Sequence, residues 1–230
     1  MYWRILCTTM LDTIFPRYCM SCEKEGTYVC VDCFETLDLS GVFDCPVCHA
    51  HTAGGEVCIP CRPNTFLHSH SAITVYKEDA LIGKMMHAFK YMHVESLVDM
   101  FDIMIQIFLN DREYVYDYIV PVPLHRRRFV ERGCNQAMIL ADIVSHYTAI
   151  PVLDILKRHK NTRQQATLSR IQRIENTTDA FVLKDNTCIL DRRILLIDDV
   201  YTTGSTLNSC AKVLSLSGAK EVHSMSLARG

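Results

Sequence analysis

Several features are missing from this 230-residue sequence, and each absence excludes a class of protein. No hydrophobic run approaches the roughly 20 residues that a membrane-spanning helix needs. The most apolar helical run, Met100–Leu109, is interrupted by Asp102 and Gln106. The first 16 residues lack a small-residue cleavage site and contain Asp12, so we expect an amphipathic helix there instead of a signal peptide. We therefore expect a cytoplasmic protein without a membrane span.

The sequence also lacks a strong net charge, since its 24 Lys and Arg and 26 Asp and Glu residues give −2. That balance excludes a general attraction to nucleic acid or to an anionic membrane. The charge is uneven, however: the 53 residues of Pro121–Arg173 contain ten Arg or Lys and three Asp or Glu, an excess of seven positive charges. This segment predicts an anionic ligand or a carboxylate-rich neighbour.

Cysteine is abundant, and eight of the 12 cysteines form four C-x-x-C pairs within a 43-residue stretch. Each pair presents two thiolates from one tight turn, which suits two corners of a tetrahedral Zn²⁺ site. Disulfides would need an oxidising compartment, and no signal peptide is visible. We predict two closed structural zinc sites in a segment that unfolds without metal, because so short a stretch buries little apolar area. The predicted ligands are Cys19, Cys22, Cys30, Cys33, Cys45, Cys48, Cys58 and Cys61.

The pairing of these four knuckles stays open in the sequence. Sequential pairing leaves spacers of seven residues after Cys22 and nine after Cys48, enough for two small ribbons, and an interleaved cross-brace is the alternative. Eight thiolates already fill two sites, so we expect the nearby histidines to be exposed polar residues near loops. These are His49, His51, His68 and His70.

The hydrophobic pattern changes after residues 62–71, a stretch with Pro, Asn and Ser that we interpret as a linker. Strand-like segments then alternate with helix-like segments. The strands are expected at residues 71–77, 117–124, 151–156, 192–200 and 221–228, and the helices at 80–91, 96–109, 135–147 and 204–216. This alternation predicts an α/β fold with a parallel sheet flanked by helices, in which ligands bind beyond the carboxyl ends of the strands. We expect two domains, residues 1–65 with an N-terminal helix and a double zinc-binding module, and residues 70–230.

The clearest strand ends on two adjacent carboxylates, Asp198 and Asp199. Carboxylates accept hydrogen bonds from paired hydroxyls such as a ribose diol, and they bind Mg²⁺, usually through waters. The turn TTGST at residues 202–206 then opens a helix, where free backbone N–H groups favour a phosphate. Taken alone, this turn has an ordinary N-cap as its alternative interpretation. The absence of a P-loop lysine argues against a nucleoside triphosphatase of that type.

The whole stretch ILLIDDVYTTGST resembles the phosphoribosyl pyrophosphate (PRPP) binding signature of type I phosphoribosyltransferases. The resemblance implies that Asp198 and Asp199 lie near the ribose hydroxyls and act in catalysis. It also implies that PRPP, including its 5-phosphate, is bound by Val200, Thr202, Thr203, Gly204, Ser205 and Thr206.

The family has a second element, a loop that binds pyrophosphate after an earlier strand, and PVPLHRRRFVERG at residues 121–133 resembles it. Guanidinium groups suit pyrophosphate because they make bidentate hydrogen bonds. A solvated basic turn is the alternative. The PRPP-binding candidates of this element are Leu124, His125, Arg126 and Arg127, with Arg128 and Arg132 also available.

Together, four stretches resemble the ComF family of competence proteins, which join a cysteine-rich zinc module to a phosphoribosyltransferase-like domain. They are the C-x-x-C pairs, PVPLHRRRFVERGCNQA, TRQQATLSRIQRIEN with its trailing AF, and ILLIDDVYTTGST. FKY at residues 89–91 also resembles a family stretch, which makes Lys90 a further PRPP-binding candidate. Cys134 departs from the aromatic residue that the family commonly has in R-G-F-N-Q.

The stretch TRQQATLSRIQRIEN, at residues 162–176, is polar, basic and long for a simple connection. In phosphoribosyltransferases the corresponding region is a mobile hood that closes the active site from water. An exposed helix with surface arginines is the alternative. The hood candidates for ligand contact are Arg163 and Gln165, followed by Arg170 and Arg173.

The resemblance implies a PRPP-binding protein of natural competence and DNA uptake. Its activity would be Mg²⁺-dependent transfer of a phosphoribosyl group to an acceptor that nothing in the sequence marks. The alternative is a non-catalytic module that uses the same fold to bind single-stranded DNA or other DNA-uptake proteins. The basic segment suits DNA phosphates, whereas the acidic zinc segment from Cys19 to Cys61 favours a protein partner.

Overall fold

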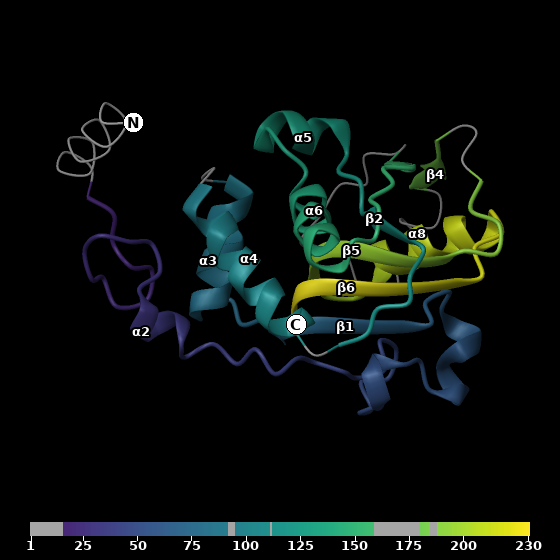
Figure 1. Cartoon of the computed structure of the whole chain (residues 1–230), viewed down its shortest axis with the longest axis horizontal. Helices are drawn as coiled ribbons and strands as arrows, with labels where there is room; N and C mark the ends of the chain where they lie inside the picture. Colours follow the sequence, from purple (N-terminus) through teal and green to yellow (C-terminus); the bar gives the residue numbers. More distant parts are fainter. Residues whose placement is uncertain (1–15, 92–94, 111, 159–179, 185–187) are drawn as a thin grey trace, which may run out of the picture.

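We describe a computed structural model of the chain, which places residues 16–91, 95–110, 112–158, 180–184 and 188–230 (Figure 1). The predicted N-terminal helix lies outside these described residues. The same holds for the predicted hood, with its candidate residues Arg163, Gln165, Arg170 and Arg173.

A four-stranded parallel sheet in the order β1-β6-β5-β2 forms the centre of the molecule. Its strands are β1 (Ser69–Val75), β2 (Tyr118–Pro121), β5 (Arg193–Tyr201) and β6 (Glu221–Arg229). β5 is an inner strand, and its apolar residues 194–197 are all buried. Such a continuous buried run is typical of a parallel strand that is covered on both faces. The predicted α/β fold with a parallel sheet is thus confirmed.

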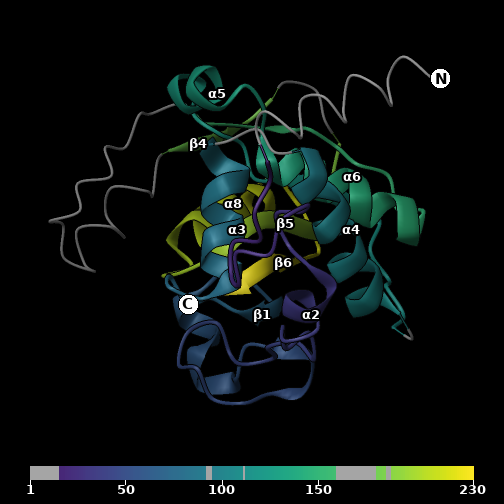
Figure 2. The same ribbon diagram turned by 90° about the vertical axis from the view of Figure 1, so that its left-hand side faces the viewer.

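Helices cover both faces of this sheet (Figures 1 and 2). The covering helices are α3 (Leu81–Tyr91), α4 (Glu95–Leu109), α6 (Gln136–Thr148) and α8 (Ser205–Leu216), and the short helix α5 (Arg126–Arg132) follows β2. α3, α4 and α6 share one core with β5 residues such as Leu195. α8 packs on the other face with β3 (Leu156–Arg158) and β4 (Phe181–Leu183), which form an antiparallel pair. None of the helices in the described ranges is long and apolar enough to cross a membrane.

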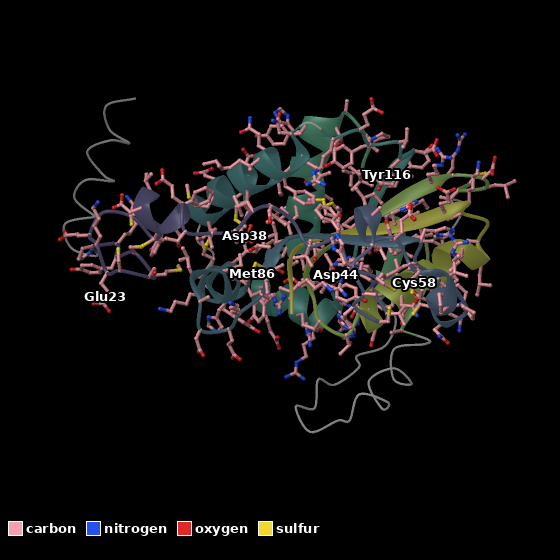
Figure 3. The ribbon with its side chains drawn as sticks, turned by 90° about the horizontal axis from the view of Figure 1, so that it is seen from below. Glu23, Asp38, Asp44, Cys58, Met86 and Tyr116 are labelled. Atoms are coloured by element: carbon pink, nitrogen blue, oxygen red, sulfur yellow. The ribbon has the colours of Figure 1, made fainter. Side chains whose placement is uncertain are left out.

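The cysteine-rich segment packs directly on the sheet domain. It contains only the short elements α2 (Val31–Phe34), η1 (Ala53–Gly55) and η2 (Ile59–Asn64). Its second half pairs with β1 through bridges from Val42 to Ala72 and from Glu56 to Ser69. Its first half contributes Val29 to the core that α3 and α4 share. Figure 3 shows Glu23 and Cys58 at well separated places, so the two halves contact different parts of the sheet domain.

Besides the expected loop at residues 121–133, which contains α5, two stretches differ from their predicted structure. The segment predicted as a strand at residues 151–156 contributes one isolated bridge, from Val152 to Ile119, and β3 begins only at Leu156. The predicted linker at residues 62–71 is partly structured, because η2 and β1 extend into it and Leu67 is buried. In both places, tertiary contacts with the sheet determine the backbone where the local pattern is weak.

His70 also differs from its prediction. His49, His51 and His68 are exposed as expected, but His70 lies within β1 and is fully buried. Its Nδ1 lies 3.0 Å from the Ser224 hydroxyl. A buried polar ring needs such partners, and the polarity of His70 alone could not show that β6 supplies them.

Candidate functional site

The site forms around Asp198 and Asp199, at the carboxyl end of β5. The Asp199 N–H donates to Asp198 Oδ1 at 2.9 Å, and the Val200 N–H donates to Asp199 Oδ1 at 2.7 Å. Burial and the neighbouring charge of Asp199 raise the pKa of Asp198 from its usual 3.8 to about 7. The Asp199 N–H, Lys90 and Arg158 oppose this rise of the pKa but do not cancel it.

Lys90 reaches this pair from the end of α3. Its Nζ lies 3.0 Å from Asp199 Oδ2, and the two side chains are only 23% and 15% exposed. The ion pair therefore connects α3 to β5 and is partly shielded from solvent. Charges interact more strongly there than at the surface.

The predicted phosphate turn follows directly. Gly204 adopts a left-handed conformation with φ of 69° and starts α8. The Thr203 and Ser205 hydroxyl oxygens lie 2.8 Å apart, and the Ser205 N–H donates to Thr203 Oγ1 at 3.4 Å. A side chain at position 204 would collide with the hydroxyl of Tyr201. The turn, which we call the cradle (residues 202–206), thus brings backbone N–H groups and hydroxyls together at a helix N-terminus.

One cleft of about 270 Å³ joins the acid pair to a set of cationic side chains. Four cations line it against two carboxylates, an excess of two positive charges when both carboxylates are ionised. The cations are Lys90, Arg128, Arg132 and Arg158. Such a balance favours a ligand with several negative charges over a neutral one. The cleft or the adjoining cradle pocket is lined by these candidates: Leu124, Asp198, Asp199, Val200, Thr202, Thr203, Gly204, Ser205 and Thr206.

The expected pyrophosphate loop contains a short helix, α5. Its start is capped by His125, whose Nδ1 accepts the Arg127 N–H at 3.2 Å. Its end is capped by Gly133 with φ of 74°, a left-handed conformation that glycine adopts without strain. An ion pair from Arg127 to Glu131 at 3.1 Å supports the helix between them.

α5 separates the arginines of this element into two groups. Arg128 and Arg132 line the cleft, whereas Arg126 and Arg127 are exposed and do not belong to the lining. His125 caps the helix and does not line the cleft either. The helical period, which the sequence did not reveal here, decides which guanidinium groups face the acid pair.

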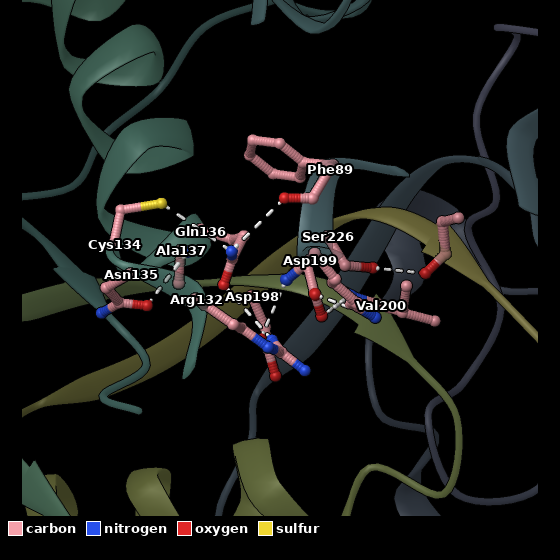
Figure 4. Close-up of polar contacts among 12 residues, drawn as sticks. Phe89, Arg132, Cys134, Asn135, Gln136, Ala137, Asp198, Asp199, Val200 and Ser226 are labelled. Carbon is pink, nitrogen blue, oxygen red and sulfur yellow. Dashed lines mark hydrogen bonds and ion pairs between the residues drawn. The ribbon is translucent and has the colours of Figure 1, made fainter. Parts of the chain in front are cut away.

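Arg132 is buried and contacts Gln136 and Tyr91. It is 7% exposed and donates to Gln136 Oε1 at 3.3 Å, while Gln136 donates to the Phe89 carbonyl at 3.4 Å. Its guanidinium lies 5.3 Å from the centre of the Tyr91 ring. Figure 4 shows Arg132 and Gln136 beside Asp198 and Asp199.

Of the four cations that line this cleft, Arg158 is the one that we did not predict. It lies at the end of β3, where burial and the charge of Arg128 lower the pKa of its guanidinium. Two signals in the sequence pointed to it: it follows a strand-like segment at its carboxyl end, and it belongs to the basic stretch.

Eight of the 12 cysteines form two groups of four, Cys19–Cys22–Cys30–Cys33 and Cys45–Cys48–Cys58–Cys61. This is the sequential pairing. Within each group, the Sγ atoms of the second and third cysteines lie 3.6 Å apart. Four thiolates around a tetrahedral Zn²⁺ would lie about 3.8 Å apart, given Zn–S bonds of about 2.3 Å. Both groups therefore fit a closed tetrahedral metal site.

Residues 131–230 match the family model of the phosphoribosyl transferase domain. These 100 residues of the 230 are therefore similar to phosphoribosyl transferase domains. The matched range includes the acid pair and the cradle, whereas Lys90, Arg128 and β2 precede it. The sheet flanked by helices is the type I phosphoribosyltransferase fold that we predicted.

The similarity to known proteins also includes the cysteine-rich segment, because one of them matches nearly the whole chain. The chain is 28% identical to Competence protein ComFC of Streptococcus pneumoniae over 98% of this chain and 99% of that protein. It is 43% identical over 113 residues to Competence protein F of Haemophilus influenzae, a match that spans 48% of this chain and about half, 49%, of that relative. The predicted resemblance to the ComF family is confirmed. Among solved structures, a purine phosphoribosyltransferase from Pyrococcus horikoshii is 26% identical, with a TM-score of 0.37, over 57% of this chain and 72% of that one.

Proposed function

We propose that this protein binds PRPP in the cleft at the end of β5 and transfers its phosphoribosyl group to an acceptor during DNA uptake. One observation carries the proposal: the acid pair, the cradle and four cations meet at one end of the sheet. PRPP carries a diol, a phosphate monoester and a pyrophosphate, and each of these groups has a complementary surface there. The link to DNA uptake is inferred from the competence proteins to which the chain is similar.

Each surface has a role in the proposed reaction. Asp198 and Asp199 accept hydrogen bonds from the ribose hydroxyls and stabilise positive charge that grows near C1. The cradle N–H groups hold the 5-phosphate. The bond from C1 to the pyrophosphate oxygen breaks, pyrophosphate leaves with the bonding electrons, and the acceptor nucleophile forms the new bond to C1. Arg128, Arg132 and Arg158 neutralise the charge that develops on the leaving pyrophosphate.

Metal ions belong to this proposal in two roles. Mg²⁺ binds carboxylate oxygens, so Asp198 and Asp199 are the residues that would hold a Mg²⁺ ion bound with PRPP. The ion would neutralise charge on the phosphate groups of PRPP. The two groups of four thiolates would hold structural Zn²⁺.

We propose residues 1–65 as the zinc-binding unit and residues 70–230 as the transferase unit. Thiolate clusters persist in a reducing compartment, which supports a cytoplasmic location.

Isothermal titration calorimetry with PRPP and Mg²⁺ tests the binding step. We expect saturable binding to the wild-type protein and a loss of at least tenfold in affinity in the Asp198→Asn/Asp199→Asn variant. Asp154→Asn/Asp191→Asn is a matched control, because it removes two carboxylates that do not line the cleft. Absence of binding to the wild-type protein would refute the proposal. Release of pyrophosphate in the presence of a panel of nucleobases then tests the transfer step.

A non-catalytic module for single-stranded DNA is the second candidate, and the exposed face of α5 favours it. Arg126 and Arg127 are exposed there, next to Phe129 and Val130, which are 49% and 77% exposed. Cations next to an exposed aromatic ring suit a nucleic acid strand. Gel shifts with single-stranded DNA at rising salt would support this module if binding weakens steeply with salt. PRPP binding without turnover would favour it further.

A further inference from the structure

Tyr201 lies between the acid pair and the cradle, within the stretch that resembles the PRPP-binding signature. It is 3% exposed. Its hydroxyl does not face the cleft but donates a hydrogen bond of 2.7 Å to the carbonyl of Pro46. Pro46 lies within the Cys45–Cys48 knuckle, 155 residues earlier in the chain. The motif is thereby tied to the second cysteine cluster (Cys45, Cys48, Cys58 and Cys61).

Arg229, at the end of β6, provides a second connection to the same knuckle. Its guanidinium donates to the Asp44 carbonyl at 2.8 Å, to the Cys45 carbonyl at 3.1 Å and to His49 Nδ1 at 2.9 Å. It is 4% exposed, and its Cζ lies 5.1 Å from the centre of the Tyr201 ring. A buried guanidinium is costly without such acceptors, so the position of the knuckle backbone matters to both side chains.

Backbone hydrogen bonds close this knuckle. The His49 N–H donates to the Cys45 carbonyl at 3.0 Å, and the Cys45 N–H donates to the Ala50 carbonyl at 2.8 Å. His49 adopts a left-handed conformation with φ of 62°, which is uncommon for residues other than glycine. A metal that joins Cys45 and Cys48 to Cys58 and Cys61 would hold this tight turn, and with it the carbonyls that Tyr201 and Arg229 use.

Tyr201 in turn packs against the cradle. A Cβ atom at Gly204 would collide with the Tyr201 hydroxyl, so the cradle backbone lies directly on the tyrosine. The ring centre of Tyr201 also lies 4.0 Å from that of His70, which is fully buried. These close contacts leave the tyrosine little room to move without displacing Gly204.

We infer that Tyr201 and Arg229 are positioning residues through which the second cysteine cluster, in its metal-bound form, sets the conformation of the cradle. Loss of this metal would lower affinity for a phosphate monoester at the cradle while sparing the pyrophosphate surface of Arg128, Arg132 and Arg158. The first cluster has its own contact elsewhere, from Lys84 Nζ to the Met20 carbonyl at 2.8 Å. The identity of the ligand rests on the proposed function, whereas the coupling of the second cluster to the cradle does not.

Tyr201→Phe tests the connection with the metal in place, since it removes the hydroxyl and keeps the ring. In the full-length, zinc-loaded protein we expect affinity for ribose 5-phosphate to fall about tenfold and affinity for inorganic pyrophosphate to change less than twofold. Tyr147→Phe, which removes a hydroxyl bonded to Asp102, is the matched control and should change neither. A merely structural role would weaken both ligands together, and that result, or unchanged affinities, would overturn the inference.

Hydrogen exchange at the cradle amides tests the metal itself without any ligand. Cys48→Ser and Cys22→Ser each remove one exposed thiolate, from the second and the first cluster respectively. With zinc content measured in both variants, we expect the amides of residues 202–206 to exchange at least tenfold faster in Cys48→Ser and at the wild-type rate in Cys22→Ser. The amides of α6 should exchange at the wild-type rate in both. Equal cradle exchange in the two variants would refute the coupling.

The two experiments separate the inference from the proposed function. If the wild-type protein binds neither ribose 5-phosphate nor pyrophosphate, the proposed function fails, and the exchange rates at residues 202–206 still decide whether the second cluster controls the cradle. If both ligands bind but cradle exchange is the same in Cys48→Ser and Cys22→Ser, the proposed function stands and the coupling fails.

Discussion

Nζ of Lys90 lies 3.0 Å from Oδ2 of Asp199, and this ion pair connects the end of α3 to the carboxyl end of β5. The lysine belongs to the stretch FKY, and the carboxylate belongs to the acid pair, 109 residues further along the chain. Lys90 also lowers the pKa of Asp198, although burial and Asp199 outweigh it. The pair therefore orients Asp199 together with the Val200 N–H, and it partly offsets the rise in the pKa of Asp198.

Replacement of Lys90 by Met should weaken PRPP binding at least tenfold, because it removes a cation from the cleft and leaves Asp199 without this partner. We also expect a loss of about 1–2 kcal/mol in the free energy of unfolding, as for a half-buried ion pair. Lys220→Met, which removes an exposed cation outside this cleft, is the control. Calorimetry and urea denaturation measure the two effects, and equal results for the two variants would contradict the prediction.

The pKa of Asp198 predicts opposite pH dependences for binding and stability. Because this pKa is about 7 in the folded protein and lower in the unfolded chain, the folded state binds more protons between about pH 4 and pH 7. The contribution of Asp198 to stability therefore decreases as the pH rises through that range. PRPP binding should instead strengthen as the pH rises through 7, since the ionised carboxylate is the better acceptor.

Asp198→Asn isolates this effect. We expect the variant to be more stable than the wild-type protein at pH 8, by about 1–3 kcal/mol, with a smaller difference at pH 5. It should bind PRPP weakly at both pH values. Urea denaturation at the two pH values measures the difference, and a variant that is less stable at pH 8 would disprove the assignment.

Arg128→Gln and Arg126→Gln test which side of α5 faces the ligand. Arg128 lines the cleft and Arg126 is exposed outside it. We expect Arg128→Gln to weaken pyrophosphate binding about tenfold, and Arg126→Gln less than twofold. The reverse order would show that the helix presents its other face to the ligand.

Gly204→Ala and Gly54→Ala separate backbone conformation from close contact. Both glycines have positive φ, 69° and 63°, but only Gly204 lies against Tyr201, while nothing lies within 4 Å of a Cβ at Gly54. We expect Gly54→Ala to cost about 1 kcal/mol and Gly204→Ala about 2–4 kcal/mol, with loss of ribose 5-phosphate binding. Equal losses in thermal or urea denaturation would mean that the contact with Tyr201 is not restrictive.

Chelation tests the role of metal in the cysteine-rich segment. We expect a strong chelator to make residues 17–61 sensitive to proteases while the sheet remains protected, because the segment has few buried apolar residues of its own. Limited proteolysis followed by mass spectrometry identifies the cut sites. Unchanged protection of residues 17–61 after complete metal removal would contradict a structural role.

Much of the fold could be predicted because it depends on local patterns. The buried run 194–197 predicted a central strand, and the C-x-x-C spacing predicted two tetrahedral sites, since both follow from backbone geometry over a few residues. Residues 151–156 could not be assigned in the same way, because their pairing depends on β4 and β2.

By itself, the sequence determined the cysteine pairs, the strand that ends in two carboxylates, and the turn that follows it, because chain neighbours stay neighbours in any fold. Only the tertiary structure decided that Arg158 and Lys90 reach the acid pair, that Arg126 does not line the cleft, and that His70 is buried. It also decided that Pro46 meets Tyr201 across 155 residues. Such contacts depend on how helices and knuckles pack on the sheet, and that packing is a property of the whole chain.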